Sequence, residues 1–395
     1  MALKIKFRVL LTQCSEPIEN GELIVEEGDV VVISSSPTER ETEETLDLSD
    51  HLLMPGFVNA HSHLGLSALG GKLSPEKTFA SWIDHLIPLN AALSDEERIR
   101  GIRMGADEMK ASGVTGLADY VADPALLKFI VDLGFRSILF LETIGFQEER
   151  AKAIAEEVEE TLKTHASNCN LGIAPHAPYS VSPKLWQRLD QLAKKYGCLL
   201  STHLAETDEE VQFIEKGGGP LVGLLKDRQA FDMSWLVPGT TPARFLKSLD
   251  VLSGMVAVHC NFIDDDIDAV QTAVFCPKST HWFGRTHILP VRKMLDAGIR
   301  VGLGTDSMAS NDSLNFLEEI RMADKMLPDV SRKEILMMAT RLGGEILRLP
   351  CGKIESGKKA DIIGFRIASQ GKDWYDLPFE PQRKKVDFYM MDGKF

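Results

Sequence analysis

The sequence lacks the features of membrane, secreted and nucleic-acid-binding proteins. No segment approaches the roughly 20 consecutive apolar residues that a membrane span requires. The first residues alternate apolar and basic side chains, as a half-buried strand does, and form no apolar block like that of a signal peptide. The formal net charge of −14 would repel a phosphate backbone, and no run of Lys and Arg offsets it locally. We therefore expect a cytoplasmic protein with neither a membrane nor a nucleic-acid partner.

Cysteine pairs are also missing. The six cysteines include no CxxC motif and lie far apart in the chain, which argues against a disulfide framework and against a cysteine zinc cluster. No internal repeat or low-complexity tract is visible. What is present is the composition of an ordinary globular protein, with 44% hydrophobic residues available for a large core. A length of 395 residues allows one α/β barrel of about 250 residues and a smaller domain.

The pattern of apolar residues changes twice along the chain. Residues 1–54 and 349–395 consist of short alternating segments broken by turn signals such as Glu27-Gly28-Asp29, which is typical of antiparallel hairpins. We predict that the two ends of the chain pair into one composite β-sandwich domain. Residues 55–348 alternate apolar, β-rich runs with amphipathic helical stretches. That alternation indicates parallel strands joined by crossover helices.

Eight such strands can be counted, and eight favours closure into a (β/α)8 TIM barrel of the α/β class. The predicted strands end near Asn59, Tyr120, Glu142, Pro175, Thr202, His259, Phe275 and Gly304. Helix boundaries are marked as well. Ser94 with Glu97 predicts a capping box, and Ser182-Pro183 and Gly197 predict the two ends of one helix.

Histidines and a carboxylate follow several of these strands. His61 and His63 are two residues apart on a strand, so both side chains point to the same face. Alone, this pair also fits two exposed or hydrogen-bonded core histidines. However, His203 and Asp306 end two further strands, and a barrel gathers its strand C-termini at one face. Three histidines and one carboxylate suit a divalent ion, Zn2+ first and Fe2+ as the alternative, with a coordination position left for water.

Several segments at the predicted strand ends resemble the amidohydrolase superfamily, and within it the branch of nucleoside deaminases and chlorohydrolases. They are residues 54–63, 176–179, 203–206, 259–260 and 302–307. Four further segments look most like those of aminodeoxyfutalosine deaminases: residues 66–69, 79–82, 276–279 and 310–314. The resemblance covers nearly the whole chain and implies the barrel with its terminal β domain.

The resemblance also implies a single ion and roles for three residues. Relatives that hold two ions use a carboxylated lysine at the end of strand four, but that strand ends here at His176 with no lysine beside it. Asp306 would take a proton from a water that the ion polarises. Glu206 would carry the proton to a ring nitrogen and then to the leaving amine. His259 would stabilise the oxygen of the tetrahedral intermediate.

Four other residues are candidate substrate contacts. His176 ends strand four, although it also fits a hydrogen-bonded histidine of the rim. Trp82 fits either a pocket wall or the core of a lid helix. Glu142 fits either a contact to ribose hydroxyls or a substrate amine, or a salt bridge at the rim. Ser279 belongs to one of the segments that carry the closer resemblance.

The expected function is therefore metal-dependent hydrolytic deamination of an aminated purine nucleoside or a related compound, such as an aminodeoxyfutalosine-like or 5′-substituted adenosine, with release of ammonia. A chlorohydrolase and a cyclic-amide or guanine hydrolase remain alternatives, because the pocket selects the leaving group. A catalytically dead, metal-stabilised binding protein is a third alternative. Glu206 and His259 argue against it, since a structural metal needs neither. We expect a small-molecule substrate and a chain that acts alone or as a homodimer.

Overall fold

Eight parallel strands form the centre of the larger part of the molecule. The computed structural model describes residues 2–368 and 373–395. The eight strands are β5 (Phe57–Ser62), β6 (Val114–Val121), β7 (Arg136–Thr143), β8 (Leu171–Pro175), β9 (Ser201–Leu204), β10 (Val256–His259), β11 (Thr272–Phe275) and β12 (Arg300–Leu303). They form two four-stranded sheets, which parallel bridges join at both edges, Ile173 to Leu200 and Ser62 to Asp306. The strands thus complete a ring, which confirms the predicted barrel.

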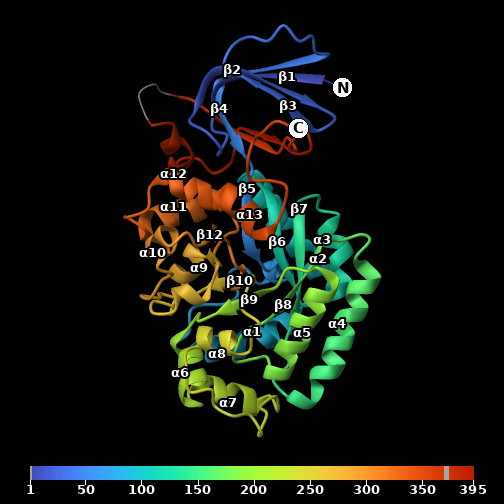
Figure 1. Ribbon diagram of the computed structural model, residues 1–395, viewed down its shortest axis with the longest axis vertical. Coiled ribbons are helices and arrows are strands. Elements are labelled where there is room, and N and C mark those ends of the chain that lie inside the picture. Colours follow the sequence, from blue (N-terminus) through green and yellow to red (C-terminus); the bar gives the residue numbers. More distant parts are fainter. Residues whose placement is uncertain (1, 369–372) are drawn as a thin grey trace.

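Helices follow the strands and cover the outside of the ring (Figure 1). They are α1 (Phe79–Ala91), α2 (Asp95–Ala111), α3 (Leu127–Val131), α4 (Ala151–His165), α5 (Pro183–Tyr196), α6 (Asp208–Lys216), α7 (Pro220–Asp227), α8 (Pro242–Ser248), α9 (Pro277–Trp282), α10 (Val291–Asp296), α11 (Phe316–Met326), α12 (Arg332–Met337) and α13 (Gly343–Leu347). Short 3-10 helices lie at 64–69, 124–126, 148–150, 267–269 and 374–379, and a π-helical turn at 338–342. None of the described helices is long and apolar enough to cross a membrane.

The predicted helix boundaries are confirmed where the sequence marks them. The Ser94 side chain and the Glu97 carboxylate form a reciprocal capping box at the start of α2. In α5, the Ser182 side chain accepts a hydrogen bond from the Leu185 amide, and Gly197 ends the helix with a φ of 68°. Its buried residues recur at helical spacing on one face. That face packs against the barrel, so local signals and tertiary packing agree.

The barrel strands are buried on both sides, as their continuous apolar runs predict. Every residue of β6 and β8 is buried. Alternate residues such as Val58, Ala60 and Ala118 point inward and form the core of the ring. The opposite residues pack against the surrounding helices in the largest core cluster. The interior is therefore filled by side chains, and the strand ends are left to build a site.

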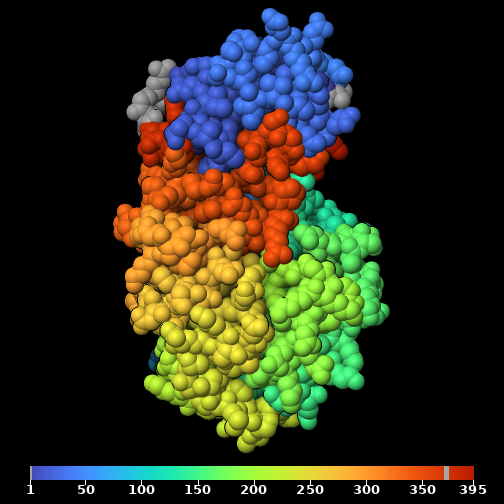
Figure 2. All heavy atoms as spheres, in the orientation of Figure 1, coloured from blue at the N-terminus to red at the C-terminus, as the bar shows by residue number. Residues whose placement is uncertain are grey.

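The two ends of the chain form one β domain beside the barrel (Figure 1). Its strands are β1 (Ala2–Leu10), β2 (Ile18–Glu26), β3 (Asp29–Ser34), β4 (Glu44–Pro55), β13 (Ile362–Arg366) and β14 (Phe388–Met390). They belong to a single hydrogen-bonded sheet in the order β14-β13-β4-β1-β2-β3, rather than to two stacked sheets. Figure 2 shows the blue N-terminal and red C-terminal segments packed together at this end.

The β domain and the barrel are joined by the chain and by ion pairs. Only Gly56 separates β4 from β5, and a Cβ atom there would lie 2.2 Å from Thr115 Oγ1, so no larger residue fits. Arg136, the first residue of β7, donates hydrogen bonds to both carboxylate oxygens of Asp361 and to Asp392. These contacts lie at the N-terminal ends of the barrel strands, opposite the end that carries the candidate site.

Candidate metal centre and active site

The C-terminal ends of the strands bring together five buried polar residues. His61 lies in β5, His63 directly follows that strand, and His203 lies in β9. His259 ends β10, and Asp306 comes three residues after β12. None of the five is more than 8% exposed. The predicted metal ligands therefore gather at one point, together with the histidine predicted to assist catalysis.

The backbone at these strand ends is unusual. Ala205, His259, Cys260 and Asp306 all have positive φ angles, between 48° and 69°. Residues other than glycine rarely adopt this conformation, which concentrates at functional sites. Gly304 completes the geometry, because a Cβ atom there would lie only 2.7 Å from the Cβ of His61. Here the chain turns sharply so that side chains point across the mouth of the barrel.

The imidazoles face one another at distances suited to a shared ion. The Nε2 atoms of His63 and His203 lie 3.3 Å apart. His203 Nδ1 lies 2.9 Å from the carbonyl oxygen of His176 and donates a hydrogen bond to it. In the neutral ring this leaves a lone pair on Nε2, directed toward His63. Burial lowers the pKa of His61 and of His63, so both rings are neutral and able to coordinate.

His61 provides the clearest sign that a ligand is required. Its ring is fully buried, and neither nitrogen has a hydrogen-bond partner among the described residues. The nearest carboxylate oxygen, Asp306 Oδ1, lies 3.6 Å from Nε2 and is too distant for a hydrogen bond. A buried imidazole without a partner is costly. Ligand atoms of His61, His63 and Asp306 lie within 4.8 Å of one another, as do those of His61, His203 and His259, so the donor set fits a divalent ion.

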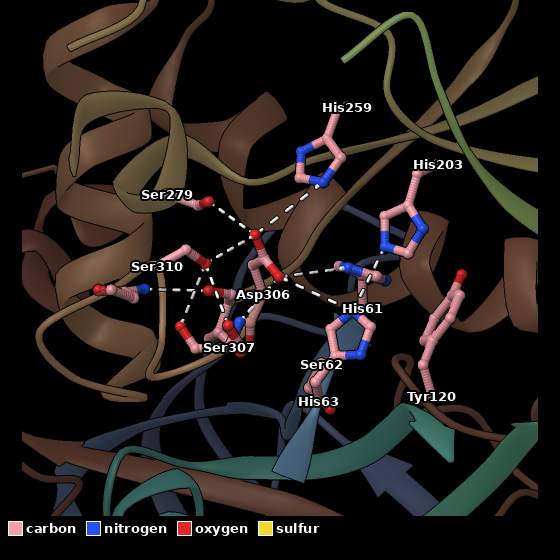
Figure 3. Close-up of polar contacts among 12 residues, drawn as sticks. His61, Ser62, His63, Tyr120, His203, His259, Ser279, Asp306, Ser307 and Ser310 are labelled. Atoms are coloured by element: carbon pink, nitrogen blue, oxygen red, sulfur yellow. Dashed lines mark hydrogen bonds and ion pairs between the residues drawn. The ribbon is translucent and has the colours of Figure 1, made fainter. Parts of the chain in front are cut away.

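The Asp306 carboxylate is fixed by several donors. Ser279 Oγ and Ser310 Oγ donate to Oδ2 at 2.6 and 3.0 Å, and the Ser307 amide donates to Oδ1 at 2.8 Å. Figure 3 shows the carboxylate between these serines and the histidines. Burial alone would raise the pKa of Asp306, but His61 and His259 hold it well below its usual range. The carboxylate is therefore ionised and oriented.

Glu206 lies beside this cluster, two residues beyond β9. Its Oε1 is 3.7 Å from His259 Nε2 and accepts a hydrogen bond of 2.7 Å from Arg285 Nη2. Burial would raise the pKa of Glu206, but His259 and Arg285 lower it below the ordinary value. Burial lowers the pKa of His259 to about 4, although Glu206 opposes that shift. Glu206, the predicted proton carrier, is thus a buried, ionised carboxylate near the residues predicted to hold the ion.

Several supporting residues were not predicted from the sequence. Glu210 accepts hydrogen bonds from the amides of Ala205 and Glu206 at 2.9 and 3.0 Å and so shapes the end of β9. Asp119 accepts one from Ser62 Oγ at 2.8 Å and one from the Leu64 amide at 2.7 Å, on either side of His63. Arg285 is the third. Asp119 and Arg285 are single charged residues in otherwise apolar or mixed segments, and Glu210 is the last of three consecutive acidic residues, so only proximity to a strand end could have drawn attention to them.

The four candidate substrate residues differ in their partners. Glu142 Oε1 has no hydrogen-bond partner among the described residues, and His63 Nδ1 lies 3.8 Å from it. His176 Nδ1 lies 2.7 Å from Ser180 Oγ. Trp82 packs in α1 against Phe79, and its indole nitrogen donates to the Ala309 carbonyl. Ser279 is bonded to Asp306, which makes it a support for the carboxylate.

A barrel whose strand ends gather histidines and a carboxylate able to hold an ion, beside a second buried carboxylate, defines a metal-dependent hydrolase. The family model that matches the chain has the same character: it describes the amidohydrolase family and covers residues 52–394. The chain belongs to the amidohydrolase family.

Individual relatives resemble the chain over nearly its full length. A 5-methylthioadenosine/S-adenosylhomocysteine deaminase of Caldanaerobacter subterraneus subsp. tengcongensis is 31% identical over 387 residues, covering 92% of this chain and 84% of the relative. The structure of Helicobacter pylori aminofutalosine deaminase with methylthio-coformycin superimposes with a TM-score of 0.85, at 22% identity and 99% coverage of both chains. A zinc-bound adenosine deaminase from Xanthomonas campestris gives a TM-score of 0.81, at 23% identity, covering 99% of this chain and 92% of that one.

Proposed function

We propose that the chain is a zinc-dependent hydrolytic deaminase of 6-aminopurine nucleosides that carry a substituent at the 5′ position. The observation that carries the proposal is the placement of Glu206. Its ionised carboxylate lies 3.7 Å from His259 and beside residues able to hold an ion. A metal that only stabilised the fold would need neither residue. The names of relatives that act on methylthioadenosine, S-adenosylhomocysteine, aminofutalosine and adenosine support this substrate class.

His61, His63, His203 and Asp306 would hold the ion, and zinc is the ion bound in a similar solved structure. When bound, zinc acts as a Lewis acid and lowers the pKa of water. β8 ends at Pro175 and is followed by His176 with no lysine beside it, which supports one ion rather than two.

The chain's own residues then account for the proton transfers. Asp306, ionised and held by Ser279 and Ser307, accepts a proton of the attacking water. Glu206, ionised at rest, takes this proton from Asp306 and delivers it to the ring nitrogen next to the carbon that bears the amine, which makes that carbon electrophilic. It then takes the second proton of the water, from the oxygen that has added to this carbon, and delivers it to the departing amine, which leaves as ammonia. His259 donates a hydrogen bond to the oxygen that adds to this carbon.

Glu142 and His176 are proposed to contact the remainder of the substrate. Glu142 has a buried carboxylate oxygen without a partner among the described residues, and its pKa is raised by burial. Ribose hydroxyls would satisfy this acceptor. The ring of His176 is tilted by 52° against that of His203, with centroids 4.9 Å apart, and its Nδ1 lies 2.7 Å from Ser180 Oγ. We assign both to substrate binding rather than to the proton transfers.

A comparison of kcat/KM values tests the proposal. The zinc-loaded protein should release ammonia from 5′-substituted adenosines faster than from adenosine, and from adenosine faster than from adenine. A substrate without ribose and the 5′ group loses binding energy that would otherwise position the ring, so kcat should fall as well as KM rise. Guanine and a chlorotriazine serve as competing substrates. Preference for either of these would contradict the nucleoside assignment but leave a metal-dependent hydrolase.

A further inference from the structure

Three buried carboxylates lie within five residues at the end of β9, and they have different partners. Glu209 accepts hydrogen bonds from the Phe79 and Ala80 amides at the start of α1, and Glu210 accepts them from the Ala205 and Glu206 amides. Both are therefore used to fix the backbone. The Glu206 carboxylate receives no backbone donor among the described residues. Its hydrogen-bond partner is the side chain of Arg285.

The guanidinium of Arg285 makes unusually few hydrogen bonds for a buried cation. Its side chain is 10% exposed. Of its five N–H donors, one reaches Glu206 Oε1, and Nη1 is buried without a partner. Arg136, which ties the barrel to the β domain, instead donates to Asp361 through two nitrogens and also reaches Asp392. A structural role would favour pairing as complete as that of Arg136.

Aromatic rings hold the Arg285 guanidinium in place. Its central carbon lies 4.2 Å from the ring centroid of Phe283 and 5.6 Å from that of Phe79. These rings pack edge to face with centroids 5.7 Å apart. A planar guanidinium stacked on an aromatic ring is restricted in rotation. Arg285 is therefore a rigid donor whose hydrogen bond is committed to one oxygen of Glu206.

This arrangement distinguishes the two carboxylate oxygens. Oε1 faces Arg285 Nη2 at 2.7 Å and His259 Nε2 at 3.7 Å. Oε2 has no hydrogen bond within the part of the chain that the structure describes. Arginine remains protonated in proteins and only donates, so a proton on Oε1 would meet a donor hydrogen. We propose that Arg285 is a positioning residue: it holds Oε1 of Glu206 and thereby makes Oε2 the oxygen that takes up a proton and delivers it to the substrate.

The inference rests on the proposed function, and Arg285→Met tests it by removing the donor while keeping an unbranched side chain. The zinc-loaded variant should lose about 10- to 100-fold in kcat, the scale of a misplaced proton carrier, with KM changed by less than about 3-fold. Arg285→Lys, which retains a cation with different geometry, should be intermediate. Arg292→Met is the matched control, because Arg292 pairs with Asp296 and Glu334 at the surface.

A double-mutant cycle separates this role from direct substrate contact. Since Arg285 acts through Glu206, adding Arg285→Met to Glu206→Gln should cause little further loss of kcat. An equal loss in both backgrounds, a change confined to KM, or wild-type kcat in Arg285→Met would each overturn the proposal. If Arg285→Met does not fold, Arg285→Ala with added methylguanidine replaces it, and recovery of kcat is expected.

A substrate-independent readout separates failure of this inference from failure of the proposed function. Ammonia release by the wild-type protein tests the function alone. In crystal structures of zinc-loaded protein, Glu206 of Arg285→Met should leave its wild-type position while the metal content stays the same. An unmoved Glu206 carboxylate would overturn the positioning role even if no nucleoside is turned over.

Discussion

Two ionic clusters lie at opposite ends of the barrel strands, and they differ in how completely their polar atoms are paired. At the N-terminal end, Arg136 is bonded to Asp361 and Asp392, and the Asp392 amide also donates to Asp361 at 3.0 Å. At the C-terminal end, unpartnered buried atoms remain on His61, Glu142, His259 and Arg285 within the described residues. The first cluster is complete within the chain, whereas the second leaves atoms for a ligand.

This difference indicates which buried charges serve the fold and which serve the chemistry. Buried polar groups are nearly always hydrogen-bonded, so a group of exceptions at one place needs an explanation. At the strand C-termini the exceptions coincide with positive φ angles at His259 and Asp306, another costly feature. A bound ion and a bound substrate would give the unpartnered atoms their partners and would account for the positive φ angles. Changes at the two ends should therefore affect different properties, either activity or stability.

The largest effect is expected for His61, whose ring nitrogens have no hydrogen-bond partner among the described residues. His61→Ala should abolish tight metal binding and lower kcat/KM by at least about 10³-fold, since an ion contributes several kcal/mol to the reaction barrier. Metal analysis and ammonia release measure both effects. His165→Ala, at the end of α4, is the control and should retain metal and activity. A His61→Ala protein that keeps one equivalent of zinc would remove His61 from the ligand set.

Glu206→Gln should reduce kcat by roughly 10²-fold or more, the usual scale for a positioned proton carrier. Gln is nearly the same size, so the fold and the metal content should be retained. Steady-state kinetics together with metal analysis test this expectation, with the exposed Glu157→Gln as a control. A metal-free Glu206→Gln protein would instead make Glu206 a ligand, and near-wild-type kcat would exclude it from the mechanism.

Arg136→Met examines the other end of the barrel. It leaves Asp361, 3% exposed, without its cation, so the free energy of unfolding should fall by about 3–5 kcal/mol. Urea denaturation measures the loss, and kcat at 25 °C should stay near that of the wild type. The exposed Arg100→Met should change neither property. Loss of kcat without loss of stability in Arg136→Met would contradict the division between the two ends.

A smaller effect is the change in stability with pH that Glu319 causes. Glu319 accepts hydrogen bonds from the Lys278 amide and from Asn311. Burial raises its pKa from 4.5 to about 8. Because the folded chain holds this proton more tightly than the unfolded chain, the stabilisation is complete below about pH 4.5 and is lost as the pH rises toward 8. Between about pH 6 and 7.5, the wild type should lose about 2 kcal/mol relative to Glu319→Gln.

Urea denaturation at both pH values measures this difference, and the exposed Glu160→Gln should follow the wild type. If the stability of Glu319→Gln and of the wild type changed in parallel with pH, Glu319 would be ionised in the folded protein.

The barrel could be predicted from the sequence because its signals are local and repeated. Eight apolar runs, the Ser94 capping box and the Ser182 to Gly197 helix all correspond to observed elements. The arrangement of the terminal strands was harder to predict from the sequence. Whether they make one sheet or two depends on pairings such as β13 with β4, between residues roughly 310 positions apart, and no local pattern encodes such a pairing.

The site was predictable to the extent that its residues lie at strand ends. Ser62 and Asp306 are far apart in the sequence, and the bridge between them follows from barrel closure. The support of Asp306 by Ser310 and the contact between Arg285 and Glu206 could not be predicted, because both depend on loop conformations. The sequence left two interpretations of Glu142, a substrate contact or a salt bridge at the rim. The structure argues against a salt bridge with lysine or arginine, since neither pairs with Glu142 among the described residues.

Locating the metal tests the account most directly. Elemental analysis of zinc-supplied, dialysed protein should find one equivalent per chain, and anomalous diffraction should place it about 2.0–2.2 Å from nitrogens of His61, His63 and His203 and an oxygen of Asp306. Two retained equivalents, no retained zinc, or an ion between His63, Glu142 and His203 instead would contradict the account.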